Sequence, residues 1–562
     1  MNAASLPQKT PFAATTSDPD HVFPPLTPAQ IARIASHGQR RAMVAGDVLV
    51  EVGQQPVPFF VVLSGEVEVR RPSAGADVLI VSQGAAQFTG EGTMLTGRRA
   101  LTRIRAVQGG EVIELRREQL LGVIQTDPEL SDIFMRAFVL RRLGLIVGGF
   151  GDVVLVGSAH SAGTLRVEAF LTRNGHPFHY IDLDRDTDAQ DLLDRFQVAA
   201  ADVPVLICRG DVVLRNPTNQ QIADCLGLND AIDRTHVRDL VIVGAGPAGL
   251  AAAVYGASEG LDVLVLEANL PGGQAGSSSR IENYLGFPTG ISGLDLTERA
   301  YAQAQKFGAQ LMIAKGASKL SCERPLYSVH LEDGGRIDAR ALIIASGAQY
   351  RKPAIPHVSQ FEGAGVYYSA SRMESQLCVA EQVVIVGGGN SAGQAAVFLA
   401  ETARHVHLLV RKDTLAETMS RYLVRRIEDH PTITVHTRTE LVALDGARHL
   451  QRVQWRDSQT GVVETHEISH VFMMTGALPN TGWLDGCVAL DAHGFIKTGP
   501  DLSADDLSKA TWPLVRPPYL LETNRPGVFA VGDARGGNIK RVASAVGEGA
   551  IAVAFVHQVL HQ

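Results

Sequence analysis

Two glycine-rich loops carry the clearest chemistry in the sequence. The first consists of Gly244, Gly246, Pro247, Ala248 and Gly249. It lies between a buried apolar strand and an alanine-rich helix, so backbone can approach a pyrophosphate held at the helix N-terminus. Glu267 ends the next strand, 18 residues after Gly249. A carboxylate there accepts hydrogen bonds from ribose hydroxyls and repels a 2′-phosphate. The pattern therefore predicts a site for FAD or NAD.

The second loop predicts a different nucleotide. It consists of Gly387, Gly388, Gly389, Asn390, Ser391 and Ala392, again between an apolar strand and an alanine-rich helix. The same spacing from Ala392 reaches Val410, and Arg411 and Lys412 follow. Cations at a strand end are usually only solvated. In register with a glycine loop, however, two cations in place of the acid favour pairing with the 2′-phosphate of NADPH.

Seven short motifs surround and include these loops. In chain order they are GAGPAG, GGQ at 272–274, IENYLGFP at 281–288, IIASGA at 343–348, GGGNSA, TGALPN at 475–480 and GVFAVGDARGGNIKRVASAVGEG. From about residue 237 to 560 the chain thereby resembles the low-molecular-weight thioredoxin reductase family. The resemblance implies an FAD domain interrupted by an NADPH domain, and a homodimer.

The resemblance also implies the residues that hold the flavin. Gln274 and Asn283 would line the flavin ring, and Asp533 would meet the ribityl and pyrophosphate. Outside the first loop, the implied FAD-binding set is Gly273, Gln274, Asn283, Ala345, Gly347, Gly532, Asp533, Arg541, Val542 and Ala543.

The redox motif of that family is missing. The family has CATC or a similar motif just before the second loop. Alignment from upstream puts Ser369 and Arg372 at the two cysteine positions, whereas alignment back from the loop puts Ala370 and Met373 there. Thiol–disulfide exchange needs a thiolate and a resolving partner, so the family's route from flavin to thioredoxin is expected to be cut. Cys378, a few residues later in an apolar context, is expected to be a packed structural cysteine.

Residues 151–230 also lack a pair of redox cysteines that their pattern would lead one to expect. Their pattern is strand, helix, strand, helix, two strands and helix. The segments VVLVGSAHSAGTLRVEAFL and VPVLIC, with Pro204, resemble glutaredoxin or another thioredoxin-fold module. In such folds a CxxC precedes the first helix, but here residues 161–164 read SAGT. Ser161 and Thr164 are expected to cap the helix instead. The favoured interpretation is a docking module without redox activity.

Short alternating strands between residues 46 and 116 predict an antiparallel roll. The segments VLVEVGQQPVPFFVVLSGEVEV and FTGEGTMLTGRRALTRIRAV resemble the cyclic-nucleotide-binding domain of catabolite-activator proteins and cyclic-nucleotide kinases. The resemblance implies that backbone N–H groups and an Arg bind the cyclic phosphate while a Glu binds the ribose. The corresponding residues are Gly90, Glu91, Arg99 and Ala100, with Thr102 close by. A degenerate interaction domain is the alternative. No DNA-reading helix-turn-helix follows.

Composition limits the partners. The chain has 51 Lys and Arg against 59 Asp and Glu, a net charge of -8 without a basic tail, so nucleic acid is not expected as a partner. No signal peptide or apolar stretch of membrane-spanning length is evident. The five cysteines are widely spaced, so a local metal knuckle is not expected and a reducing cytoplasm fits best.

The predicted fold class is multidomain: an N-terminal β-roll of the cyclic-nucleotide-binding kind, a central α/β thioredoxin-like fold, and a C-terminal α/β pair of Rossmann-like FAD- and NAD(P)-binding domains. The predicted parts are a disordered leader (1–25), the roll (26–147), the thioredoxin-like domain without CxxC (151–230), the FAD domain (237–352 and 477–562) and the NADPH domain (353–476). The expected function is an NADPH-dependent FAD oxidoreductase with an unidentified acceptor, regulated by a cyclic nucleotide. The alternatives are a sensor with little turnover and a ferredoxin- or quinone-reductase-type flavoprotein.

Overall fold

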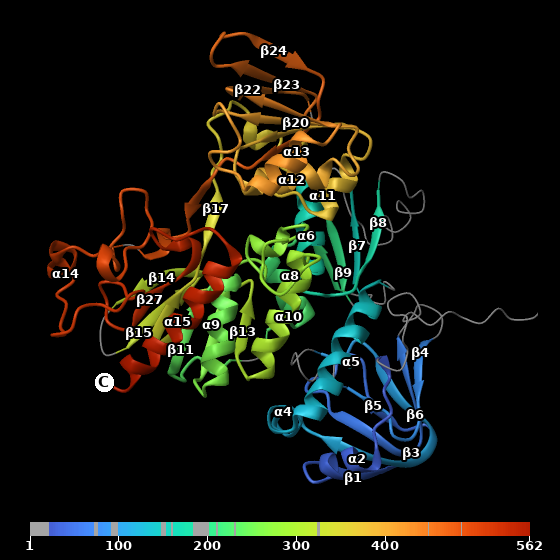
Figure 1. The fold of residues 1–562 in the computed structure, drawn as a ribbon. Helices are drawn as coiled ribbons and strands as arrows, with labels where there is room; N and C mark the ends of the chain where they lie inside the picture. Colours follow the sequence, from blue (N-terminus) through green and yellow to red (C-terminus); the bar gives the residue numbers. More distant parts are fainter. Residues whose placement is uncertain are drawn as a thin grey trace, which may run out of the picture.

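The structure is a computed structural model. It describes residues 22–71, 77–90, 99–147, 153–158, 161–183, 202–208, 212–229, 232–322, 326–447, 449–484 and 486–562. Four parts follow one another along the chain, which we name the roll, the middle module, and the first and second Rossmann regions (Figure 1).

The roll is a six-stranded antiparallel sheet in the order β1-β6-β3-β4, with β2 paired to β6 and β5 to β3. Helix α2 begins at Pro28, and the side chain of Thr27 caps it by accepting from the Gln30 backbone N–H. The chain over 117–147 forms two helices that meet at Asp127, whose Oδ1 accepts a hydrogen bond from the Leu130 backbone N–H at 3.1 Å. The elements are α2 (Pro28–Ala35), β1 (Gln39–Met43), β2 (Val48–Val50), β3 (Phe59–Arg71), β4 (Val78–Gln83), β5 (Phe88–Thr89), β6 (Arg103–Leu115), α4 (Arg117–Thr126) and α5 (Pro128–Val147).

The middle module is a four-stranded sheet in the order β10-β9-β7-β8, with β7 and β8 parallel and β9 antiparallel to both its neighbours. Its elements are β7 (Val153–Gly157), α6 (Ala162–Arg173), β8 (His179–Asp182), β9 (Val205–Cys208), β10 (Val212–Arg215) and α8 (Asn219–Leu226). The helix predicted at 188–196 lies outside the described residues.

The predicted cap of α6 is wrong in its detail. Ser161 occupies the N-cap, but its side chain makes no capping hydrogen bond to any described residue. Thr164 lies inside the helix and is fully buried. A Cβ added to Gly157 would stand 2.3 Å from its Oγ1. Thr164 is therefore packed against β7, because the helix starts one turn too early for its hydroxyl to reach the first N–H groups.

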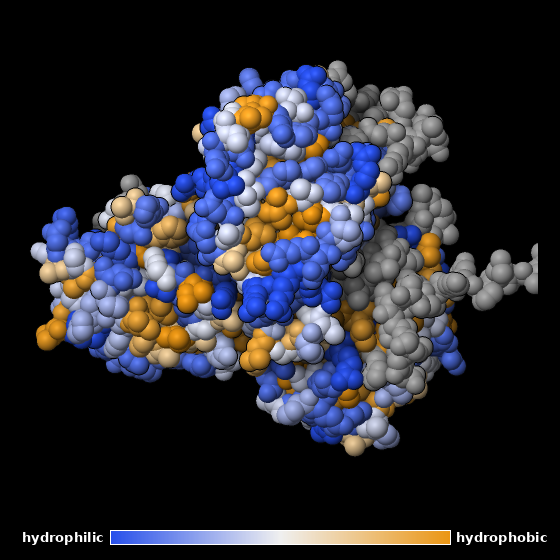
Figure 2. Space-filling model, turned by 45° about the horizontal axis from the view of Figure 1, so that its top comes forward, coloured by the Kyte–Doolittle hydropathy of each residue, from blue (hydrophilic) through white to orange (hydrophobic). Residues whose placement is uncertain are grey.

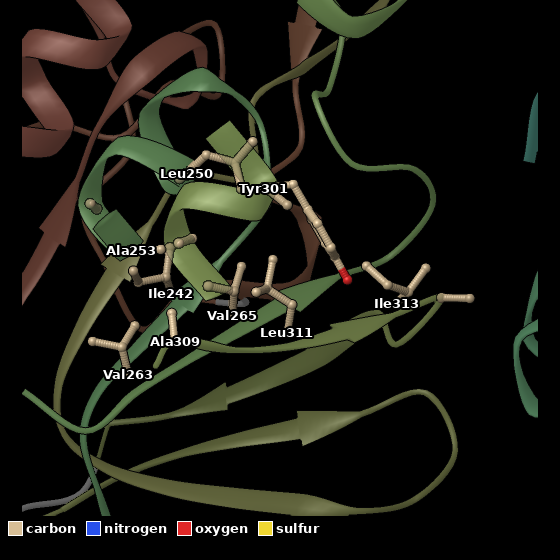
Figure 3. Close-up of a cluster of buried hydrophobic side chains, with 14 of the residues drawn as sticks. Ile242, Leu250, Ala253, Val263, Val265, Tyr301, Ala309, Leu311 and Ile313 are labelled. Atoms are coloured by element: carbon tan, nitrogen blue, oxygen red, sulfur yellow. The ribbon is translucent and has the colours of Figure 1, made fainter. Parts of the chain in front are cut away.

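The first Rossmann region has a seven-stranded sheet in the order β13-β12-β11-β16-β15-β14, with β27 on β16. Strands β13, β12, β11, β16 and β27 are parallel, so both faces of this part of the sheet need cover. Figure 3 shows one covered face, where Leu250 of α9 and Tyr301 of α10 pack on Ile242, Val265 and Leu311. The elements are β11 (Arg238–Val243), α9 (Pro247–Ser258), β12 (Val263–Glu267), α10 (Gly293–Lys306), β13 (Gln310–Ile313), β14 (Ala317–Ser321), β15 (Tyr327–Leu331), β16 (Arg336–Ile344), α14 (Ala504–Lys509), β27 (Val528–Ala530) and α15 (Val542–Leu560).

The second Rossmann region is inserted into the first. The chain leaves through β17 (Ala348–Tyr350) and returns through β26 (Ala477–Pro479), and these two strands pair antiparallel. The inserted sheet is parallel, in the order β18-β25-β19-β20-β21, and carries a separate three-stranded sheet β22-β23-β24. Its elements are β18 (Val366–Tyr367), α11 (Arg372–Leu377), β19 (Gln382–Val386), α12 (Asn390–Leu399), β20 (His405–Val410), α13 (Arg421–Glu428), β21 (Ile433–Thr437), β22 (Thr439–Asp445), β23 (Arg452–Asp457), β24 (Val463–His466) and β25 (His470–Met473).

The sequence predicted no apolar stretch of membrane-spanning length, but helix α15 is long and apolar enough to cross a membrane by length and composition, and 28% of the tested window is buried. Its inner side packs on α9, since a Cβ at Gly549 would stand 2.3 Å from the Ala248 carbonyl oxygen. We therefore assign α15 to the first Rossmann region. On the face seen in Figure 2, hydrophobic residues form separate groups among hydrophilic ones.

Two cysteines that are far apart in sequence are paired. Cys322 and Cys487 form a disulfide between Cα atoms 6.0 Å apart, although 165 residues separate them. The sequence spacing did not predict this pair. Among the described residues, no cluster of three His, Cys, Asp or Glu side chains is placed to hold a metal ion.

Candidate functional site

Both glycine loops open into one cavity of 1720 Å³. In each Rossmann region the loop follows the central strand, β11 or β19, at its carboxyl end. Ligands bind at this edge in open α/β sheets. The cavity wall also includes residues from the middle module.

The three glycines of the first loop have different tasks. At Gly244 φ is 108°, and a Cβ would stand 2.3 Å from the Ala345 carbonyl oxygen. A Cβ on Gly249 would stand 1.9 Å from the Gly244 oxygen. Gly246 instead faces the cavity, where the nearest atom to an added Cβ is Gly273 Cα at 3.9 Å. Thus Gly244 and Gly249 allow the tight turn, and Gly246 leaves room for a ligand.

Glu267 lies at the predicted place in the cavity wall and organises the loop as well. Its carboxylate accepts hydrogen bonds from the backbone N–H of Ala245 at 2.7 Å, Asn269 at 2.8 Å and Leu270 at 3.1 Å. Burial raises the pKa of Glu267, while these N–H groups and then Arg173 act in the opposite direction. These backbone N–H groups therefore fix the position of the Glu267 carboxylate without a ligand, a structural role that the sequence pattern did not predict.

Most residues implied for the flavin line the cavity. These are Gly273, Gln274, Asn283, Ala345, Gly347, Gly532, Asp533, Arg541 and Val542, together with Pro247 and Ala248 of the loop. Gln274 Nε2 donates to the Ala348 carbonyl oxygen. Within the part of the chain that the structure describes, the cavity wall does not include Gly249 or Ala543. Ala543, in the first turn of α15, is exposed, and its position near the flavin stays a prediction.

Asp533 is mostly buried, which raises its pKa, while Lys540 lowers it. Glu548, which lies within the last motif but had no predicted role, fixes the turn around Asp533. Its carboxylate accepts from the Gly532 backbone N–H at 2.7 Å and from Arg535 Nη2 at 2.6 Å.

The second loop is also open to a ligand. At Gly387 φ is 148° and a Cβ would stand 2.5 Å from the Met474 carbonyl oxygen, whereas a Cβ on Gly389 would meet no described atom within 4 Å. Asn390 Oδ1 accepts from the Ser420 backbone N–H at 2.7 Å, which holds the loop to the start of α13. The predicted residues Gly387, Gly389, Asn390, Ser391, Ala392, Arg411 and Lys412 all line the cavity. Lys412 Nζ lies 2.8 Å from Glu417 Oε2.

Tyr350, at the end of β17, also lines the cavity. Its hydroxyl is hydrogen-bonded to Ser391 of the second loop. Burial and then the negative charge of Asp533 raise the pKa of Tyr350, so this side chain stays neutral between the two sites. The motifs gave no indication of this residue, because its role depends on how the two regions face each other.

The segment before the second loop carries an acid. Glu374 accepts hydrogen bonds from Ser369 Oγ at 2.9 Å, from the Ser371 backbone N–H at 2.9 Å and from Ser371 Oγ. Ser369, Ser371 and Glu374 line the cavity. Cys378 is fully buried, as predicted for a packed cysteine, and burial raises its pKa to about 12. A thiol with this pKa is not a nucleophile near neutral pH.

The predicted cyclic-nucleotide residues are only partly described. Gly90 has φ 95°, and a Cβ there would stand 2.4 Å from the Pro58 carbonyl oxygen. Glu91 lies outside the described residues. Ala100 is buried and bonded through its backbone to Gly53 and Gln54, which places Arg99 and Thr102 at either side of an ordered turn. Arg99 Nε donates to Gln55 Oε1 at 3.4 Å.

The residues present fit two dinucleotides. No side chain among the described residues caps α9 or α12 at Gly246 or Gly389, so their first N–H groups face the open cavity. Gly347, with φ 65°, also leaves open space. An acid follows the first loop and two cations follow the second. These donor sets suit a pyrophosphate in each loop, with a 2′-phosphate only in the second.

Comparison with known proteins agrees with this geometry. Residues 238–549 match the pyridine nucleotide-disulphide oxidoreductase family, and residues 40–127 match the cyclic nucleotide-binding domain. NADPH-dependent thioredoxin reductase 3 of Arabidopsis thaliana is 31% identical over 360 residues, which make up 61% of this chain and 64% of that protein. Thioredoxin reductase of Treponema pallidum (strain Nichols) is 33% identical over 317 residues, 56% of this chain and 94% of that protein.

Solved structures give the same result. Thioredoxin reductase of Lactococcus lactis in its FR conformation has a TM-score of 0.52 at 27% identity, and the match covers 58% of this chain and 100% of that one. The family match covers more than half of the chain. The chain therefore belongs to the pyridine nucleotide-disulphide oxidoreductase family, as a thioredoxin-reductase-like flavoprotein oxidoreductase that uses FAD and NADPH and carries a cyclic nucleotide-binding domain.

Proposed function

We propose that this oxidoreductase passes electrons from NADPH through its flavin directly to an external acceptor, without a dithiol of its own. The observation that supports this proposal is the cavity that the two glycine loops share. Both glycine loops and the segment 368–374 open into it, and that segment presents serine hydroxyls and Glu374 to the cavity. A relay by thiol–disulfide exchange needs two sulfurs there.

The chain's own residues orient the two cofactors and discriminate NADPH from NADH. FAD, when bound, supplies the chemistry that accepts a hydride from NADPH and releases electrons to the acceptor. Arg411 and Lys412 select the 2′-phosphate, and Gly389 leaves space for the pyrophosphate of NADPH. Tyr350, which ends the strand leading into the second Rossmann region, lies beside Ser391 of the second loop in the cavity wall. Buried Cys378, with its raised pKa, takes no part.

The test is anaerobic stopped-flow reduction by NADPH or NADH, followed by mixing with thioredoxin disulfide, a ferredoxin or a quinone. We expect rapid bleaching of the flavin by NADPH, and recovery of its absorbance with the quinone or ferredoxin but not with thioredoxin disulfide. Recovery with thioredoxin disulfide at a comparable rate would show that a dithiol of the chain is not needed for disulfide reduction, and the proposal of a different acceptor would fail.

A second candidate function is cyclic-nucleotide sensing, and the position of Arg99 favours it. A Cβ on Gly227 would stand 2.9 Å from Arg99 Nε, so Arg99 packs against the C-cap of α8 in the middle module. The C-terminal end of a helix attracts a cation. Two residues on, Asn229 exchanges hydrogen bonds with the backbone of Ile313 in β13, at 2.6 and 3.0 Å. A cyclic phosphate that drew Arg99 from α8 would act on a segment bonded to the FAD sheet.

For this coupling we expect cAMP or cGMP to raise the melting temperature and to change the rate of flavin reduction by NADPH. Saturation at 100 times Kd corresponds to about 2.7 kcal/mol of added stability. Arg99→Ala should abolish both effects, and Arg40→Ala, an exposed arginine of the same roll paired with Glu111, should not. A melting temperature unchanged by either nucleotide would leave the roll as an interaction domain.

We also propose that the enzyme is a homodimer and that the middle module is a thioredoxin-like docking module. Exposed apolar residues on adjacent helices, Tyr255 of α9 at 44% and Ile551 of α15 at 44%, support a covered face there. The sheet order of the module, with Pro204 Cδ 2.8 Å from a Cβ on Gly163, supports the second proposal. Sedimentation velocity tests the homodimer, and a monomer would contradict it. Trapping of mixed disulfides tests the docking module, and a trapped adduct at Cys208 would contradict it.

A further inference from the structure

Two faces of helix α6 of the middle module contact different parts of the molecule. Thr164, Val167, Phe170 and Leu171 are buried within the structure on the side of the module's own sheet. Ala169, Thr172 and Arg173 form part of the wall of the nucleotide cavity. Residues three and four apart lie on one side of a helix, so the spacing of this second set gives α6 a continuous face toward the flavin site.

Arg173, at the end of this face, is anchored in the first Rossmann region. Its Nη2 donates to the carbonyl oxygens of Pro271 at 2.7 Å and Gly273 at 2.6 Å. A Cβ on Gly276 would stand 2.6 Å from the same nitrogen, so the glycine makes room for the guanidinium. Nε is buried and has no hydrogen-bond partner among the described residues.

The loop that Arg173 holds touches the pyrophosphate loop. A Cβ built on Gly273 would stand 3.2 Å from Gly246 Cα. Gly272 and Gly273 both have positive φ, 88° and 53°, a conformation that glycine adopts without steric cost. Burial lowers the pKa of Arg173 to about 10, and the negative charge of Glu267 opposes that shift. The guanidinium therefore remains charged at neutral pH, beside the carboxylate of the flavin site.

The other end of α6 is held as well. A Cβ on Gly363 would stand 2.4 Å from Ala162 Cβ, and Leu165 packs on the core of the second Rossmann region. In Figure 1, α6 accordingly lies next to α11 and α12. These contacts fix the position of the helix at both ends, so Arg173 reaches the flavin loop only while the module is docked.

We propose that Arg173 is a positioning residue of the FAD site, supplied by the middle module, and that FAD binding therefore requires the docked module. A bound FAD adds a pyrophosphate dianion to a site whose own acid, Glu267, is already buried. Arg173 provides a cation in the wall of that cavity and holds the loop that borders the phosphates. This inference depends on FAD as cofactor and not on the proposed acceptor.

The experiment uses the full chain with Arg173 replaced by Ala, Gln and Lys, and Arg166→Ala as the matched control. Arg166 lies on the same helix, but its guanidinium is bonded inside the module, to Asn219 Oδ1 at 2.7 Å and the Pro217 carbonyl oxygen at 2.6 Å. FAD content per chain and the FAD dissociation constant, from fluorescence of apoprotein titrated at low and high salt, are the readouts.

For Arg173→Ala we expect FAD affinity to fall about 10- to 100-fold, the effect of losing charged hydrogen bonds. Arg173→Lys should recover part of the affinity and keep its salt dependence, whereas Arg173→Gln should keep neither. Arg166→Ala should bind FAD as the unaltered chain does. If Arg173→Gln and Arg173→Ala bind FAD with unaltered affinity, Arg173 serves docking alone and the proposal is wrong. Should Arg173→Ala fail to fold, the Lys and Gln variants decide the question.

Discussion

Replacing Arg411 and Lys412 together by alanine is expected to lower kcat/KM for NADPH about 100-fold and to leave kcat/KM for NADH nearly unchanged. Each charged hydrogen bond to the 2′-phosphate contributes about 1.5–3 kcal/mol, and solvent exposure of both side chains places the effect at the lower end of that range. Because we place these two cations at the 2′-phosphate alone, the loss is expected in the binding of NADPH and not in the step that follows. Rapid-mixing measurements of flavin bleaching against nucleotide concentration separate the two quantities.

Two controls distinguish a specific contact with the 2′-phosphate from a general effect of positive charge on NADPH binding. Arg425→Ala removes an exposed arginine of α13 that lies outside the cavity wall, and it should leave the NADPH preference unchanged. Glu417→Ala removes the carboxylate 2.8 Å from Lys412 Nζ and should preserve or increase the preference. If the double variant still prefers NADPH as strongly as the unaltered enzyme, the 2′-phosphate is recognised elsewhere and our assignment of the two cations is wrong.

Local patterns were sufficient for the elements that build the site. An apolar strand, a glycine loop and an alanine-rich helix follow one another within about 30 residues, and each step restricts the backbone of the next. Both glycine loops, Glu267 and the Arg411–Lys412 pair therefore lie where their spacing predicted. Ala543 is near the site in sequence, but it is exposed and lies outside the cavity wall of the described residues. A helix turns by about 100° per residue, so a motif that spans a helix start includes side chains that point away.

Contacts between parts of the chain were not predictable in this way. Arg173 is 98 residues from Pro271, and Arg99 and Gly227 belong to parts that no shared motif connects. The disulfide joins residues 165 apart. Periodicity describes which face of an element is buried, but it does not identify the element that buries it. These contacts depend on docking of folded parts, and they account for what the sequence missed at the site: Arg173, Tyr350 and the position of Arg99.

Replacing Gly389 by valine is expected to abolish flavin reduction by NADPH while the protein keeps its FAD and its melting temperature. The reason is steric. Gly389 has φ -94°, which any residue adopts, and a Cβ there meets no described atom within 4 Å. The new side chain would stand in the cavity at the N-terminus of α12, where the pyrophosphate of NADPH must approach the backbone. We expect NADPH affinity to fall at least about 100-fold, since displacing a phosphate from such N–H donors removes several charged hydrogen bonds.

The neighbouring glycine provides the contrast. Valine at Gly387 meets the Met474 carbonyl oxygen at 2.5 Å from its Cβ and requires φ 148°, so this variant should lose stability together with activity. Gly122→Ala in α4, where a Cβ also meets no described atom within 4 Å, is a control outside the cavity; it should leave NADPH reduction unchanged and should not lower stability, because Ala favours a helix over Gly. Equilibrium titration with NADPH and thermal unfolding, measured on the same three variants, separate ligand exclusion from misfolding. Normal NADPH binding by Gly389→Val would mean that the nucleotide does not occupy the second loop, and the pairing of its 2′-phosphate with Arg411 and Lys412 would then lose its structural basis.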